Sequence, residues 1–124
     1  MKKIGFLLFI FSIVFNTLAF AGYGYKSQSS SKNVTTAGTA LPLSATTQQY
    51  HSLDVCAKKG NTGWIGVGGS NVVASATAGT GVQLAAGDCY SLDGPNEVNG
   101  DLLNLYIDTT VNGEGVVYAY NNRA

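Results

Sequence analysis

Hydrophobic and polar residues alternate along most of the chain after residue 33. Leu53 and Val55 alternate with polar neighbours, and Val116, Tyr118 and Tyr120 fall on one face of the run near the C-terminus. Because successive side chains of a strand point to opposite faces, this period of two predicts half-buried β-strands. We expect strands within 40–45, 50–57, 63–68, 81–86, 89–92, 102–108 and 115–120, and either a brief strand or a bridge between sheets at 71–76.

Turn-forming residues separate these runs. Gly60-Asn61, Asn99-Gly100 and Asn112-Gly113 each supply a residue that tolerates positive φ. After the first 21 residues, no 11-residue window sustains the apolar period of a helix. Short strands at this spacing predict an all-β fold, a small antiparallel β-sandwich or a jelly-roll-like barrel, in one domain over 34–124. Pro42 places the first strand at a sheet edge.

The stretch GWIGVGGSN, residues 63–71, raises the question of a phosphate-binding loop. A dinucleotide fingerprint would need a third glycine where Asn71 stands, and a helix where Val72 begins another extended run. The Gly-Lys-Ser/Thr of a P-loop is absent from this stretch. We therefore interpret it as a strand that ends in a glycine turn, with Gly66 marking a close approach of backbone or of a large side chain.

The first 33 residues differ from the rest. Lys2 and Lys3 precede an apolar run, and Ala19-Phe20-Ala21 fits a signal-peptidase site, so residues 1–21 are predicted to be a secretory signal peptide. A retained membrane anchor is disfavoured because the apolar run is shorter than a membrane-spanning helix. Residues 22–33 are rich in Ser and Gly and are predicted to form a flexible arm.

Removal of the signal peptide changes the composition. All five Phe residues leave with it, so the core must consist of Val, Leu, Ile and Tyr. Five Lys/Arg then face seven Asp/Glu, a net charge near −2. Nucleic acid and anionic lipid both require clustered basic residues, so we expect no nucleic-acid partner, and membrane contact only during export.

Cys56 and Cys89 are the two cysteines of the chain. In an exported protein an even count favours a disulfide, and two buried free thiols are the alternative. With His51 they provide too few ligands for a zinc site. The acidic stretch 93–101 does not have the spacing of a calcium-binding loop and is interpreted as a solvated turn. We predict no catalytic, cofactor or metal site.

Large aromatic side chains outside a core often mark interfaces. Trp64, Tyr118 and Tyr120 are therefore the candidate contact residues. The alternative is that they fill the core, since no Phe remains to do so.

Residues 61–120 resemble small β-sandwich proteins encoded in the structural modules of tailed bacteriophages. The resemblance lies in Val-Gly-Gly-Ser at 67–70, the Gly-x-x-Leu-x-x-Gly segment at 81–87, Asp-Leu-x-x-Leu-Tyr at 101–106 and the final strand at 116–120. It implies a non-enzymatic virion accessory part, such as a head-decoration, head-fibre or tail-associated protein, often oligomeric.

The signal peptide favours a second hypothesis, an exported periplasmic or cell-surface module that binds a glycan or a protein. Both hypotheses place the protein outside the cytoplasm or in a virion. Both expect protein partners, including further copies of the chain.

Overall fold

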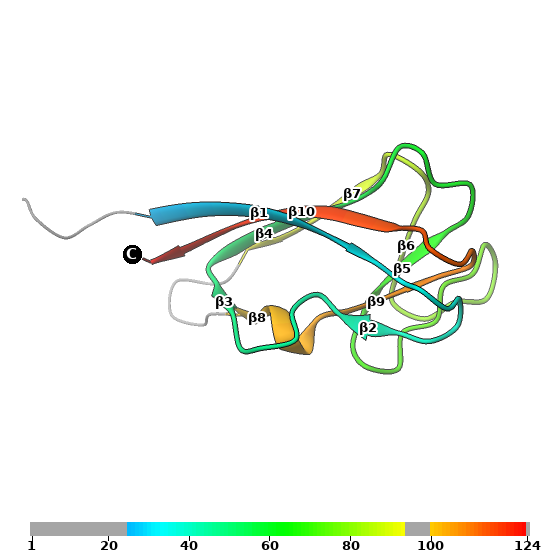
Figure 1. Ribbon diagram of the computed structural model, residues 1–124, viewed down its shortest axis with the longest axis horizontal. Coiled ribbons are helices and arrows are strands. Elements are labelled where there is room, and N and C mark those ends of the chain that lie inside the picture. Colours follow the sequence, from blue (N-terminus) through cyan, green and yellow to red (C-terminus); the bar gives the residue numbers. More distant parts are fainter. Residues whose placement is uncertain (1–24, 94–99, 124) are drawn as a thin grey trace, which may run out of the picture.

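A computed structural model describes residues 25–93 and 100–123. The predicted signal peptide, residues 22–24 of the predicted arm and most of the acidic stretch 93–101 lie outside the described residues. Two four-stranded antiparallel sheets form two layers, and a two-stranded sheet lies at one end of the molecule (Figure 1). The prediction of an all-β, antiparallel, sandwich-like fold is confirmed.

The two main sheets, which we call sheet A and sheet B, both mix segments from the two halves of the chain. Sheet A has the strand order β1 (Tyr25–Asn33), β10 (Gly115–Arg123), β4 (Ser52–Ala57), β7 (Cys89–Asp93). Sheet B has the order β2 (Leu41–Pro42), β9 (Tyr106–Thr109), β5 (Ile65–Gly68), β6 (Val82–Leu84). The third sheet pairs β3 (Gln49–Tyr50) with β8 (Gly100–Asp101).

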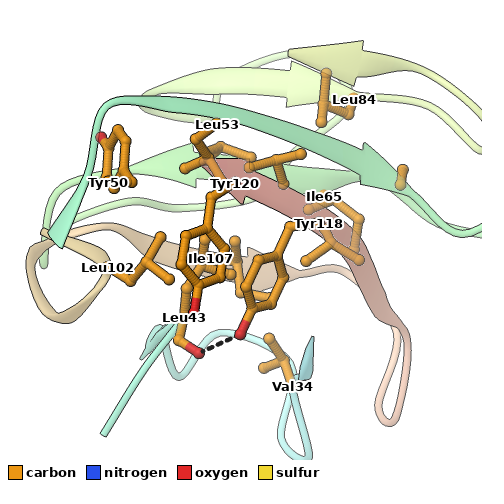
Figure 2. Packing of buried hydrophobic residues seen from close by; sticks show 14 residues of the cluster. Val34, Leu43, Tyr50, Leu53, Ile65, Leu84, Leu102, Ile107, Tyr118 and Tyr120 are labelled. Atoms are coloured by element: carbon orange, nitrogen blue, oxygen red, sulfur yellow. Dashed lines mark hydrogen bonds between the residues drawn. The ribbon is translucent and has the colours of Figure 1, made fainter. Parts of the chain in front are cut away.

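The core lies between sheets A and B. Strand β4 supplies alternate residues to it: Leu53, Val55 and Ala57 are at most 2% exposed, with Asp54 exposed between them. Ile65 and Ile107 come from the opposite sheet and are fully buried. The predicted period of two is therefore the pattern that builds this core. Its cluster comprises Val34, Leu43, Tyr50, Leu53, Val55, Ala57, Ile65, Val67, Leu84, Leu102, Ile107, Val116, Tyr118 and Tyr120 (Figure 2).

Strand β1 corrects the sequence interpretation. The sequence predicts a flexible arm over 22–33, but Tyr25–Asn33 is a regular strand that pairs with β10 at nine positions. Residues 26–31 are exposed, so no hydrophobic period reveals the strand in the sequence. Its order comes from backbone hydrogen bonds to β10, which lies about 90 residues away in the chain. The folded domain therefore includes β1.

The segment 102–108 also differs in part from expectation. Leu102–Asn104 forms one turn of 3-10 helix, and the strand β9 begins only at Tyr106. The Asp101 side chain accepts a hydrogen bond from the Leu103 backbone N–H at the start of this turn and so caps it. Leu102 is 1% exposed, because the turn directs it into the core.

The stretch GWIGVGGSN is a strand followed by a turn, as interpreted. Its central residues form β5, and the Val72 N–H then donates to the Gly69 carbonyl across the turn. A Cβ at Gly66 would lie 3.2 Å from both the Cα and the N of Ala74. The glycine therefore allows the backbone of the next segment to pass close over the sheet.

Candidate functional site

The predicted disulfide between Cys56 and Cys89 is present and joins β4 to β7. The two residues are direct partners in the strand register, with Cα atoms 4.0 Å apart. Cys89 is exposed and Cys56 is half-buried, because both point away from the core. The bridge is therefore a surface feature of sheet A, and it fits an oxidising compartment.

Alternate residues of sheet A point away from sheet B and form what we call the outer face. Because the four strands pair in register, these residues form three rows that cross the strands. Every side chain in the rows is short, and most are polar. The rows are Ser27, Asn121, Ser52, Asp93; Ser29, Ala119, Asp54, Ser91; and Ser31, Val117, Cys56, Cys89.

Hydrogen bonds connect the polar members of these rows across the strands. The Ser27 hydroxyl donates to the Asn121 side-chain oxygen, and the Asn121 amide donates to the Ser52 hydroxyl over 3.1 Å. In the second row the Ser91 hydroxyl donates to the Asp54 carboxylate. These bonds hold short side chains in fixed positions, so the outer face is an ordered surface without deep hollows or long projecting side chains.

Two shallow grooves lie on this face. The first, of about 530 Å³, runs over β1, β10 and β4 and is lined by Ser29, Asp54 and Val117 among others. The second, of about 430 Å³, shares Val117 with the first and extends past the disulfide to Lys58 and Lys59. Val117, which lines both grooves, is 46% exposed. An exposed apolar side chain surrounded by a mostly polar surface is a typical position for contact with a partner protein.

The two candidate contact tyrosines do not belong to this surface, and that prediction is corrected. Tyr118 and Tyr120 are each 8% exposed and lie between the sheets, so their rings cannot meet a partner. Figure 2 shows both rings pointing from β10 toward Leu43. The core alternative therefore holds for these two tyrosines, because no Phe follows Phe20 in the chain to fill this space.

Both tyrosine hydroxyls nonetheless have partners. The Tyr118 hydroxyl donates to the Leu43 carbonyl over 3.2 Å, and the Tyr120 hydroxyl donates to the Gln28 side-chain oxygen over 2.9 Å. Burial, with a smaller contribution from Tyr118, raises the pKa of Tyr120. Trp64 is half-buried and directly precedes β5, outside both grooves, and its contact role stays a prediction.

Asp108 is a buried carboxylate, 1% exposed, on β9. One of its oxygens accepts from the Gly38 backbone N–H and the other from the Ala74 N–H, both over 2.9 Å. Both oxygens thus hold neighbouring loop segments to β9 in sheet B. Among residues 25–93 and 100–123, no three His, Cys, Asp or Glu side chains gather as metal ligands would.

The sequence contained one overlooked signal for the outer face. The stretch 25–33 contains no Gly or Pro, and every residue from 26 to 33 is polar. Such a run is compatible with a strand exposed on both faces, but hydrophobic periodicity is the usual criterion and it misses such strands.

No family model matches the chain, and neither the curated proteins nor the solved structures include a significant match. Within the described part of the chain there is no helix with the length and hydrophobicity to cross a membrane.

Proposed function

We propose that this protein is a non-enzymatic, exported structural protein that acts through the surface of sheet A. The observation that carries the proposal is β1, a nine-residue edge strand whose residues 26–31 are exposed. Ordering such a strand costs conformational entropy and buries little apolar surface in return. An interaction made by β1 and the outer face would offset that cost.

Within this proposal the protein is a phage-derived virion accessory part. The motifs at 67–70 and 101–106 support it: they form the end of β5 with its turn, and the segment that leads from β8 into β9. These are turn and core positions of a sandwich-like fold, which agrees with the architecture that the resemblance implies.

A second candidate is an exported binding module for a protein or a glycan. The disulfide favours it, since such bridges persist in oxidising compartments outside the cytoplasm. The two grooves beside Val117 would be its binding surface.

The test compares two variants with matched exposure. Val117→Arg places a charge at the centre of the outer face, and Val73→Arg places the same charge at a residue that is 49% exposed and outside both grooves. The tagged full-length chain and each variant are produced in the native host. Mass spectrometry then quantifies them in purified phage-like particles, in the periplasm and in the medium.

If the protein is a virion part, we expect both the parent chain and Val73→Arg in the particles. Val117→Arg should be at least about tenfold less abundant there, because loss of a central contact worth more than about 1.4 kcal/mol weakens binding by that factor. Recovery of all three in the exported fractions alone would favour the binding module. Equal particle content of the two variants would overturn the role of sheet A.

A further inference from the structure

The two edges of sheet A differ from those of sheet B. The sheet B edges are β2, with two residues including Pro42, and β6, with three residues. A short edge strand, or one that contains proline, prevents a strand of another molecule from pairing with the sheet. The sheet A edges are β1, with nine residues, and β7, with five, and neither contains Pro or Gly. Among the described residues, no backbone group pairs with the outer side of either strand.

The directions of the two edge strands are complementary. Each neighbouring pair in the order β1, β10, β4, β7 is antiparallel, so β7 runs antiparallel to β1 across the sheet. A second copy shifted along the sheet would place its β7 beside β1 in antiparallel orientation. The joint sheet would continue without a break.

The charges of the two edges are also complementary. β1 carries Lys26 and Lys32, whereas Asp88 directly precedes β7 and Asp93 ends it. Pairing of β1 with a second β1 over its full length would set Lys26 opposite Lys32, and like charges directly opposite each other destabilise a sheet. The charges therefore disfavour a symmetric dimer through β1.

One register satisfies both the faces and the charges. If Ser29 lies opposite Ser91 of the next copy, then Ser31 lies opposite Cys89 and the three outer-face rows continue from copy to copy. The same register sets Lys32 opposite Asp88. On the inner side it sets Gln28 and Ser30 opposite Leu92 and Tyr90, two half-buried side chains that the added strand would cover.

We infer that copies of this protein associate head to tail, with β1 of one copy pairing with β7 of the next. The interface is heterologous, since it joins two different edges, and such an interface produces open chains of copies unless a rotation closes them into a ring. The inference deepens the structural role proposed above and rests on it, with a second copy of this chain as the partner.

The test is a disulfide trap in the full exported chain. The double variant S29C/S91C places thiols at opposite edges, three strand spacings or about 14 Å apart within one copy, too far for an internal bridge. We expect a ladder of dimers, trimers and larger species after oxidation, with a crosslink between the two introduced thiols found by peptide mapping. Each single variant stops at dimers, and S30C/S91C, whose thiols face opposite sides of the sheet, crosslinks at least about tenfold less.

A charge swap provides an independent readout. Lys32→Glu is expected to raise the concentration for half-assembly in sedimentation about tenfold, and K32E with D88K to restore it. Asp88 also accepts a hydrogen bond from the Ala85 N–H, so circular dichroism verifies the fold of the double variant. A double-cysteine chain that stays monomeric or stops at dimers, with Cys56–Cys89 intact, overturns the inference.

The two proposals can fail separately. A chain that never crosslinks beyond dimers but loses its particle association in Val117→Arg refutes the head-to-tail pairing and keeps the structural role. A chain that forms the ladder but occurs in no particle refutes the virion role and keeps the pairing.

Discussion

At the scale of single residues, this small domain uses carboxylates as anchors for its loops. Asp108 ties the segments at Gly38 and Ala74 to β9, and Glu114 accepts from both the backbone and the hydroxyl of Thr62 and from the Gly63 N–H. Carboxylates suit this task because ionised acceptors form stronger hydrogen bonds than neutral ones.

Asp108→Asn is expected to lower the free energy of unfolding by about 2 kcal/mol, because an amide offers only one acceptor and leaves one buried N–H without a partner. Urea unfolding followed by fluorescence measures the loss. Asp93→Asn, at an exposed position, is the control and should change stability by less than about 0.5 kcal/mol. An equal loss in both variants would contradict the anchoring role.

Glu114 makes stability depend on pH. Hydrogen bonds from the Thr62 backbone and side chain, and from Gly63, hold its pKa below the usual value for a glutamate. A carboxyl whose pKa is lower in the folded state contributes stability above its unfolded pKa, and this contribution is lost as pH falls through the folded pKa. We expect Glu114→Gln to flatten the acid limb of the urea midpoint measured against pH. A variant with the unchanged parent profile would show that the carboxylate has no such part.

At the scale of elements, β1 depends on β10 for its order, and Gly115 is a position where the two strands approach closely. A Cβ there would collide with the Lys32 carbonyl and would lie 2.7 Å from the Asn33 Cα. Both are backbone atoms, so no side chain can move aside.

Gly115→Ala is therefore expected to cost at least about 2 kcal/mol and to release β1 from β10. Hydrogen exchange should show faster exchange of the β1 amides than in the parent chain. Gly60→Ala, where no atom lies within 4 Å of the new Cβ, is the control and should protect β1 as the parent does. Unchanged protection in Gly115→Ala would refute the close approach.

At the scale of the whole molecule, the disulfide closes a loop that crosses between the sheets. The 33-residue separation between Cys56 and Cys89 includes β5 and β6 of sheet B, while both cysteines belong to sheet A. The bridge thus restricts the unfolded chain over a segment that supplies half of sheet B. Because both sulfurs face outward, their removal leaves no core cavity.

The double variant C56S/C89S is expected to lose about 3.5–4 kcal/mol, the chain-entropy value for a loop of this length. Urea unfolding of the variant, and of the parent chain with and without reductant, measures the loss. A variant as stable as the oxidised parent would contradict a stabilising role for the bridge.

The sequence by itself determined the all-β class, the inward faces of β4 and β10, the edge position of Pro42 and the turn after β5. Each of these follows from local chemistry, since the period of two, proline and glycine act on the residues beside them. The tertiary structure alone decided that 25–33 is a strand, because its hydrogen-bond partners lie about 90 residues away. It also decided that Tyr118 and Tyr120 are core residues, since only packing of the sheets shows which face is covered. The rows of the outer face likewise exist only after four distant segments pair in register.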